Sequence, residues 1–413
     1  MIDMLRRNAV LRSLALGYGT AQLGTQIGWI ALVWWVLNSA RSPQLLGALF
    51  VAYQLPSLLT APLTGAVLER FQAKTVALYA STSATLALTA LAGLSTAGRL
   101  TVPLLLGLVV VFALTAPATL TYRRLLIGEI TRADELPAAY ALFSFGSEAA
   151  LLIGPAAGGF LVGRWSVSVA LWCSACGTAL YLAAVLASPY SSRTQLHERK
   201  LDVLKGTREI LCRPLVLAIT LLTFFFFFAY GPLEVALPVA ARTIFHTDAT
   251  GYGLMWTAYA VGSVSGLLLL RSRYQRLPPT FILCSIAVMW GALASALAFA
   301  YSLPVAMIVL SLAGFLWSPY NAIEQAFMQI HVPKELQGAV FSMQSSFLYT
   351  MAVPLGVMAG GWALAHASPR TVILASGMAC IAAGIGGYVG ISRVLRSGRS
   401  MPRCVPYQII ARN

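Results

Sequence analysis

Long apolar stretches separated by short polar segments dominate this sequence. Twelve of them have about 20 residues or more, enough to cross a hydrocarbon core of roughly 30 Å as helices rising 1.5 Å per residue. Their approximate bounds are 13–38, 44–68, 75–98, 101–122, 137–163, 165–188, 214–240, 251–270, 278–300, 303–327, 338–366 and 369–391. The pattern predicts an all-α membrane protein with twelve transmembrane helices in two pseudo-symmetric six-helix bundles.

The second half of the chain repeats features of the first at an offset of about 200 residues. The matches include Arg70-Phe71-Gln72 with Arg273-Tyr274-Gln275, after the second span of each half, and Glu135-Leu136 with Glu335-Leu336, before the fifth. We expect an N-terminal half (1–188), a cytoplasmic linker with a short amphipathic helix (189–213), a C-terminal half (214–391) and a basic cytoplasmic tail (392–413). Two parallel six-helix repeats are the layout of a transporter whose halves rock about a midplane site.

Composition excludes an ordinary soluble enzyme. Only 10% of the 413 residues are charged and 58% are hydrophobic, with a mean hydropathy of +0.77. Soluble proteins carry roughly 25% charged residues. Most of this apolar surface must therefore face lipid or other buried helices.

The distribution of basic residues predicts the orientation in the membrane. With the N-terminus inside, 23 of the 28 Lys and Arg residues fall in cytoplasmic segments and 5 in outer loops. This bias follows the positive-inside rule and supports both termini in the cytoplasm of a cell (inner) membrane protein. The formal net charge of +15 is spread between the spans. It forms no single basic stripe, so we expect no nucleic-acid partner.

A polar loop between the second and third spans carries a recognisable motif. It reads Gly65-Ala-Val-Leu-Glu69-Arg70-Phe-Gln-Ala-Lys74 and resembles the cytoplasmic signature loop of the major facilitator superfamily. The resemblance implies that Gly65, Glu69, Arg70, Lys74 and Arg124 form a latch that holds one conformation. Gly65 would let two helices approach closely, and the charged residues would form a network between helices. Taken alone, the loop is better explained as a short positive-inside connection. Its recurrence in the second half, together with the number of spans, favours the family interpretation.

The fifth span contains Gly154-Pro155-Ala-Ala-Gly158-Gly159. Pro155 removes a backbone donor and bends the helix, and Gly154 and Gly158, four residues apart, permit close helix packing. The element is similar to one found in the drug and metabolite:proton antiporters of the same superfamily. The run from Arg124 through Glu129 and Leu136-Pro137 to Gly159 resembles most the branch that includes macrolide and siderophore exporters. Gly and Pro clusters are also common in transmembrane helices generally. The first span departs from many proton-coupled members because it has no carboxylate.

Three carboxylates lie within predicted spans. Glu148 is in the fifth span, Glu234 follows the Gly-Pro break of the seventh, and Glu324 lies near the cytoplasmic end of the tenth. An uncompensated charge in hydrocarbon is costly, so each is a candidate for proton coupling. Glu324 has a structural alternative, an ion pair with Arg124 or Lys334.

Polar and aromatic side chains share faces of three spans and are candidates for lining a substrate cavity. In the first span Tyr18, Gln22, Gln26 and Trp29 follow helical spacing. The candidates in all three spans are Gln22, Gln26, Trp29, Tyr230, Trp317 and Asn321.

No cluster of residues has the spacing of a catalytic or metal site. The sequence offers no phosphate loop, nucleophile elbow or His/Cys/Asp set. Cys173-x-x-Cys176 lies within an apolar span, where we expect small packing residues. We predict no enzymatic activity, no cofactor and no metal.

These features favour a transporter that exports an amphiphilic small molecule by proton antiport with alternating access. The expected partners are a small-molecule substrate, protons and membrane lipid. We expect a monomer, because two halves contain a complete pathway. Two alternatives remain: an uptake or facilitative transporter of the same fold, and a membrane receptor or scaffold without turnover.

Overall fold

The computed structural model of the chain describes residues 8–39, 42–131, 135–188, 203–270, 277–344 and 350–396. Within these ranges the regular structure is helical and contains no strand. The predicted all-α fold class is confirmed: eleven of the twelve predicted spans each coincide with one helix of the structure, and the span 338–366 corresponds to two.

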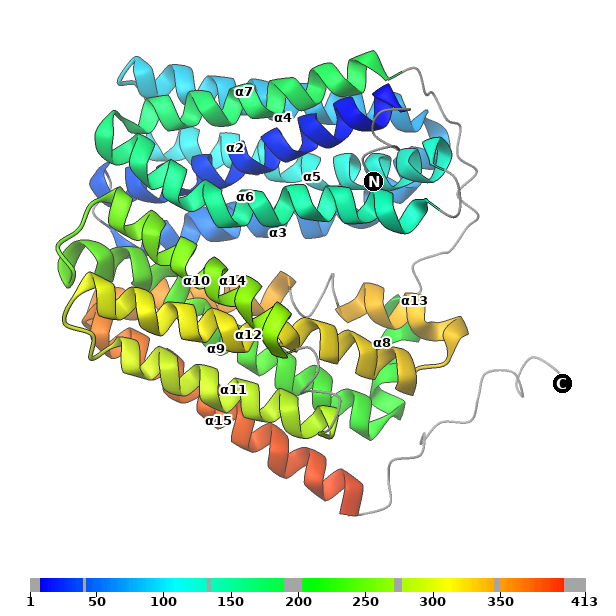
Figure 1. The fold of residues 1–413 in the computed structure, drawn as a ribbon, viewed down its shortest axis with the longest axis vertical. Helices are drawn as coiled ribbons and strands as arrows, with labels where there is room; N and C mark the ends of the chain where they lie inside the picture. Colours follow the sequence, from blue (N-terminus) through cyan, green and yellow to red (C-terminus); the bar gives the residue numbers. More distant parts are fainter. Residues whose placement is uncertain are drawn as a thin grey trace, which may run out of the picture. The chain divides into compact units, whose positions relative to one another are not determined.

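The first six spans are long, nearly uninterrupted helices. They are α2 (Ala9–Ser39), α3 (Pro43–Arg70), α4 (Ala73–Thr96), α5 (Val102–Ile130), α6 (Leu136–Arg164) and α7 (Val167–Ala187) (Figure 1). The α5 helix ends at Ile130, eight residues beyond the predicted span end at 122. Its last two turns contain Arg123, Arg124 and Glu129. Hydropathy falls there while helical hydrogen bonding continues, so an apolar window underestimates the length of the helix.

The second part of the chain adds two short helices to its spans. Its helices are α8 (Val203–Cys212), α9 (Pro214–Thr243), α10 (Ala249–Leu270), α11 (Pro279–Leu297), α12 (Leu303–His331), α13 (Lys334–Met343), α14 (Thr350–His366) and α15 (Pro369–Arg396). The amphipathic helix expected in the linker is α8. The predicted span 338–366 corresponds to α13 and α14, and residues 345–349 between them lie outside the described ranges.

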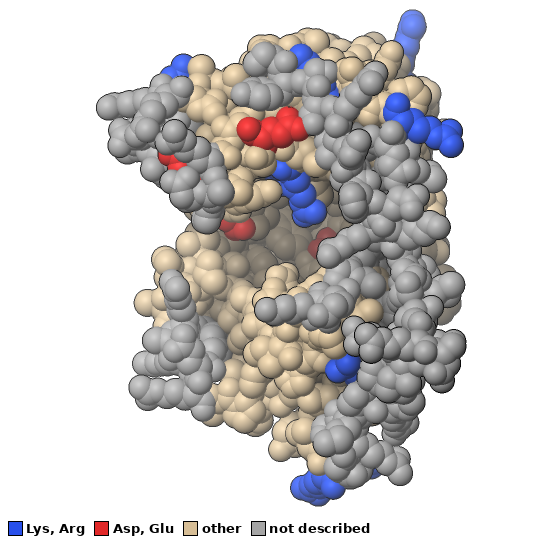
Figure 2. Space-filling view, turned by 90° about the vertical axis from the view of Figure 1, so that its right-hand side faces the viewer, with Lys and Arg blue, Asp and Glu red and all other residues tan. Residues whose placement is uncertain are grey.

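Length and composition identify a multi-pass membrane protein. Among the described residues, nine helices (α4, α5, α6, α7, α9, α10, α11, α12 and α15) are long and apolar enough to cross a membrane, and α14 is a shorter apolar helix. The helices α2 and α3 have 31 and 28 residues with more polar side chains, such as Gln22 and Gln54. Charged side chains are sparse on the described surface in the space-filling view (Figure 2).

Packing divides the chain into two compact units that do not follow the sequence halves. Unit 1 comprises Met1–Glu198, Leu237–Ala260 and Tyr301–Met307, and unit 2 comprises Arg199–Ala236, Val261–Ala300 and Ile308–Asn413. The helices α9, α10 and α12 therefore each contribute residues to both units.

In unit 1 the helix α2 is central. It packs between α6 and α7, while α7 also contacts α4, and α5 contacts α3 and α4. One apolar core cluster joins α2, α5, α6 and α7 through residues including Leu14, Tyr122, Phe143 and Tyr181. A polar residue on an inward face of α2 consequently faces the interior of the bundle.

Aromatic and small residues form the core of unit 2. The Phe226 ring of α9 lies 5.6 Å from Trp290 and 5.3 Å from Tyr320. The helices α11 and α15 lie side by side (Figure 1). A Cβ atom at Gly291 would come within 2.6 Å of the Gly377 carbonyl oxygen. Small residues let these two helices approach closely, as is common between membrane helices.

One sequence prediction about packing is wrong. Cys173 and Cys176 are exposed free thiols on α7. Both side chains lie on the surface and not in the helix packing. A small apolar side chain suits a lipid-facing surface as well as a helix interface.

Candidate functional site

A polar cavity lies inside unit 1, next to α2; we call it the α2 cavity. Its volume is about 290 Å³. The polar residues that line it are Tyr18, Gln22, Thr25, Tyr53, Ser81, Thr115, Thr119, Thr178 and Tyr181. None of these described lining residues is formally charged. The α2 cavity is therefore suited to uncharged groups that donate or accept hydrogen bonds.

One hydroxyl in the α2 cavity lacks a protein partner. Ser81 is 1% exposed, and its Oγ has no hydrogen-bond partner among the described residues. A buried polar atom without a partner is costly, typically about 1–3 kcal/mol. Water or a ligand group in the α2 cavity would satisfy Ser81 Oγ.

The basic residue Arg123 lies against an aromatic residue that lines this cavity. The guanidinium carbon of Arg123 lies 4.1 Å from the ring centroid of Tyr18 and 5.8 Å from that of Phe143. The Tyr18 hydroxyl is hydrogen-bonded to Ser147 Oγ at 3.0 Å. The cation is thus held against aromatic faces on α2 and α6.

The predicted polar stripe of the first span divides between two environments. Gln22 lines the α2 cavity. Gln26 instead packs against α6, because a Cβ added at Gly154 of that helix would overlap the Cβ of Gln26. Trp29 contacts the rings of Phe50 and Tyr53 at 4.6 and 4.7 Å. Helical spacing predicted a shared face, but the neighbouring helices assign its members different roles.

In unit 2 a carboxylate lies within an aromatic group, which we call the Glu234 cluster: Glu234, Tyr230, Trp290, Trp317 and Tyr320. The Tyr230 hydroxyl donates a hydrogen bond to Glu234 Oε1. The Tyr230 ring lies 5.3 Å from Trp290 and 6.4 Å from Trp317. A carboxylate next to several aromatic faces is chemistry suited to a proton and to an organic cation.

The α12 stripe predicted from the sequence contains both buried and exposed members. Trp317 stacks on Tyr320 at 5.6 Å, and the buried Tyr320 hydroxyl is hydrogen-bonded to Thr223 Oγ1 at 3.0 Å. Glu324 is 3% exposed, and Asn321 is exposed. Sequence reasoning missed Trp290, which no polar neighbour on α11 marks as part of a site.

The carboxylate of the fifth span lies elsewhere. Glu148 is exposed on α6, directly after Ser147, whose hydroxyl contacts Tyr18. Glu148 belongs to unit 1 and Glu234 to unit 2.

Two faces of the Gly-Pro element contact different helices in unit 1. On one face, a Cβ at Gly158 would lie 2.9 Å from the Cα of Ile27 on α2, next to the Gly154 contact. On the other face, a Cβ at Gly159 would overlap the carbonyl oxygen of Ala249, at the start of α10. Pro155 is buried, and its carbonyl oxygen lies against Gly253 of α10.

Hydrogen bonds accompany this contact between α6 and α10. Thr250 Oγ1 donates to the Gly159 carbonyl at 3.3 Å, and Thr257 Oγ1 donates to the Leu152 carbonyl at 3.2 Å. Both helices approach at glycine, so hydroxyl groups of α10 reach backbone carbonyl oxygens of α6.

Parts of the predicted latch are described. Lys74 Nζ donates to the Leu186 carbonyl at 3.4 Å and also to the Ser188 carbonyl, at the C-terminal end of α7. Arg70 and Arg124 are exposed. The side chain of Glu69 and the surroundings of Gly65 lie outside the described part of the structure. In this conformation Lys74 stabilises the negative end of the α7 dipole.

No group of three or more His, Cys, Asp or Glu side chains within the described ranges is placed to hold a metal ion.

Comparisons with known proteins identify the fold independently. The sequence model of the Major Facilitator Superfamily matches residues 14–353. The chain is 25% identical over 361 residues to the multidrug efflux pump Tap of Mycolicibacterium fortuitum, covering 83% of this chain and 86% of that protein. It is 24% identical over 391 residues to the Tap pump of Mycobacterium tuberculosis, covering 88% and 89%.

Solved structures of transporters share this fold at low sequence identity. A nucleoside transporter NupG variant superimposes with a TM-score of 0.72 at 13% identity, covering 92% of this chain and 99% of that one. A POT family transporter in complex with a thioalcohol-conjugated peptide has a TM-score of 0.73 at 10% identity, covering 93% and 96%.

Proposed function

Since this chain belongs to the Major Facilitator Superfamily and is a membrane transporter, we propose that it exports an amphiphilic small molecule in exchange for protons. The observation that carries the proposal is the Glu234 cluster, where Tyr230 holds a carboxylate among aromatic rings. A carboxylate within a membrane binds either a proton or an organic cation at low cost, but not both at once. That competition is the elementary requirement of antiport.

The direction of transport is inferred from relatives and from the Gly-Pro element. The similar curated proteins named above are multidrug efflux pumps. The solved nucleoside and peptide transporters share only the fold, because their identities are 13% and 10%. Export is therefore favoured over uptake and over a receptor without turnover.

The substrate class follows from the chemistry of the two sites. The Glu234 cluster would bind a cationic or aromatic part of the substrate, with Trp317 and Tyr230 offering ring faces. The α2 cavity would accept uncharged hydrogen-bonding groups next to Gln22 and Ser81. An amphiphile with one positive charge and several oxygens carries both kinds of group.

We propose that the contact between α6 and α10 opens and closes during transport. A ligand shifts a conformational equilibrium only through its different affinity for the two states. Protonation of Glu234, of Glu148 or of both would supply that difference. The loop residues Gly65, Glu69, Arg70 and Lys74, with Arg124, would act as a second latch. A monomer in a bacterial inner membrane, with both termini inside, completes the proposal.

Accumulation of fluorescent and antibiotic amphiphiles in expressing and non-expressing cells tests the proposal. We expect lower accumulation in expressing cells and its reversal by a protonophore. Higher accumulation in expressing cells would instead indicate uptake. If no compound is exported, counterflow in proteoliposomes with the secreted metabolites of the host decides between a narrow substrate range and a protein without turnover.

A further inference from the structure

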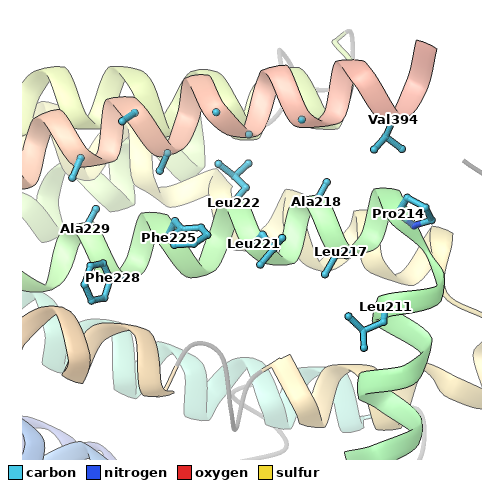
Figure 3. Close-up of a pocket in the computed structure, with 16 residues that line it drawn as sticks. Leu211, Pro214, Leu217, Ala218, Leu221, Leu222, Phe225, Phe228, Ala229 and Val394 are labelled. Carbon is cyan, nitrogen blue, oxygen red and sulfur yellow. The ribbon is translucent and has the colours of Figure 1, made fainter. Parts of the chain in front are cut away.

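Unit 2 carries an apolar groove between α9 and α15 that the transport proposal does not use; we call it the α9–α15 groove. Its volume is about 720 Å³. The α9 residues that line it include Leu217, Leu221, Phe225 and Phe228, and Figure 3 shows Ala218, Leu222 and Ala229 of the same helix pointing toward α15. Phe225 is 53% exposed and Leu221 is 43% exposed. In a membrane-spanning helix, such exposed apolar side chains contact lipid.

The groove exists because the opposite wall has almost no side chains. The residues of α15 that face it are Ala379, Ala382, Ala383, Gly386, Gly387 and Gly390. A Cβ at Gly386 or Gly390 would meet no other atom within 4 Å, whereas one at Gly387 would come within 2.7 Å of Leu222. Gly386 and Gly390 therefore border open space, and Gly387 is a packing contact between the helices.

The groove is long enough to hold an acyl chain of one leaflet of a bilayer. Along α9 it extends from Pro214 to Ala229, which corresponds to about 22 Å at 1.5 Å per residue. The hydrocarbon chains of one leaflet span roughly 15 Å, half of a 30 Å core. An acyl chain that enters at one end of the groove therefore fits within it.

Two basic residues are close in sequence to the residues that line one end of the groove. Leu211 of α8 and Val394 of α15 line this end, where Pro214 begins α9 (Figure 3). Arg208 lies one turn before Leu211 on α8, and Arg393 directly precedes Val394; both are exposed. Residues three apart share a helix face, so Arg208 lies on the side of α8 that closes the groove. Arg393 is in the last turn of α15.

We propose that the α9–α15 groove binds one anionic phospholipid, with an acyl chain along Phe225 and Gly386 and the phosphate at Arg208 and Arg393. The apolar slot supplies the hydrophobic contact. The guanidinium groups supply charge-assisted hydrogen bonds to phosphate, and two such groups near a bilayer surface attract anionic lipid. The proposal does not depend on the direction of transport or on proton coupling.

Native mass spectrometry of the full-length protein in detergent tests this site. Phosphatidylglycerol and phosphatidylcholine with identical acyl chains are titrated separately onto delipidated protein. We expect one phosphatidylglycerol to bind about tenfold more tightly than phosphatidylcholine, a difference of ~1.4 kcal/mol. The double substitution Gly386→Leu/Gly390→Leu fills open space without a clash and should abolish this tight binding.

Two further variants separate the contributions of the groove and the charges. Arg208→Gln/Arg393→Gln leaves the slot intact and should remove the preference for phosphatidylglycerol. Gly93→Leu/Gly107→Leu is the matched control, because a Cβ at either position in unit 1 also meets nothing within 4 Å. The control should bind as the unaltered protein does, and size-exclusion profiles establish that each variant is folded.

Three outcomes would overturn the proposal. The first is unchanged phosphatidylglycerol binding in the groove-filled variant, and the second is equal binding of both lipids by the unaltered protein. The third is a dimer that the groove-filling substitutions dissociate, since the occupant would then be a second copy of the chain. None of these three outcomes requires a transport assay, so failure of the antiport proposal leaves this test intact.

Discussion

The hydroxyl of Tyr230 donates a hydrogen bond to the carboxylate of Glu234, one turn later on α9. Tyr230 also faces the indole ring of Trp290, with ring centroids 5.3 Å apart. The pair thus couples the charge state of Glu234 to the orientation of a phenol within an aromatic group. A proton on Glu234 weakens the hydrogen bond that it accepts, and so changes the surface that a substrate meets.

Glu234→Gln should abolish proton-driven export. The amide is nearly isosteric with the carboxylic acid but binds no proton, so the exchange step is lost while the site keeps its shape. We expect the protonophore-sensitive part of efflux to fall at least about tenfold, which corresponds to ~1.4 kcal/mol or more in the rate-limiting step. Efflux of a fluorescent amphiphile from preloaded cells measures it.

Substitution of Glu148, the exposed carboxylate on α6, separates the two coupling candidates. Glu148→Gln is the matched variant, because Glu148 lies on α6 in unit 1 and outside the Glu234 cluster. Loss of efflux in Glu148→Gln alone would move the coupling role to Glu148. Unchanged efflux in both variants would contradict proton coupling through either residue.

A disulfide between α6 and α10 should trap the transporter. An ideal Cβ at Gly163 would overlap Thr250 Oγ1, so paired cysteines there come within the roughly 3.5–4.5 Å Cβ separation of a disulfide. In a background without the six native cysteines, oxidised Gly163→Cys/Thr250→Cys should lose transport, and reduction should restore it. Cross-linking is measured by gel mobility after a protease cleaves between the two helices.

The single-cysteine variants control for the substitutions themselves. If the cross-linked protein transports at the rate of the reduced protein, the α6–α10 contact does not open during transport. If no disulfide forms under oxidation, the two helices are not adjacent in the membrane as they are in unit 1.

Much of the fold could be predicted from hydropathy, because a bilayer imposes length and apolarity on every spanning helix. The apolar window failed at helix ends, as at α5, where the helix continues through Arg123 and Arg124 to Ile130. It also gave no sign of the separate helices α13 and α14. Within the described residues, the units cut across α9, α10 and α12, and no local pattern encodes such packing.

The candidate site was harder to predict because helical spacing identifies a shared face but not what covers it. Tyr230 and Glu234, four residues apart, could be paired from the sequence. Trp290 could not, because it comes from α11, sixty residues along the chain. Gln26 shares a face with Gln22, yet Gly154 of α6 packs against it. Tertiary contacts therefore decided which predicted residues line a cavity.

Ser81→Ala should stabilise the protein and weaken transport. The Ser81 hydroxyl is buried without a partner among the described residues, so removing it relieves about 1–3 kcal/mol. Thermal unfolding in detergent should shift upward by a few degrees. The Michaelis constant for an oxygen-rich substrate should rise if the α2 cavity binds it.

Thr85→Ala serves as a control on the same helix, since the Thr85 hydroxyl donates to a backbone carbonyl. A lower unfolding temperature in Ser81→Ala would show that the hydroxyl already has a partner.

The cation held by Tyr18 leads to a prediction about stability that does not involve transport. Arg123 lies 4.1 Å from the Tyr18 ring centroid, and such contacts are worth about 0.5–1 kcal/mol at partly exposed sites. Tyr18→Phe keeps the ring and loses only the hydrogen bond to Ser147. Tyr18→Leu loses the ring as well, so it should lower the unfolding temperature further. Combining each substitution with Arg123→Gln completes a double-mutant cycle. In the Arg123→Gln background, the extra fall in unfolding temperature of Tyr18→Leu relative to Tyr18→Phe should vanish. If Tyr18→Leu destabilises equally with and without the arginine, the ring contributes through packing alone and the cation–π contact adds nothing measurable.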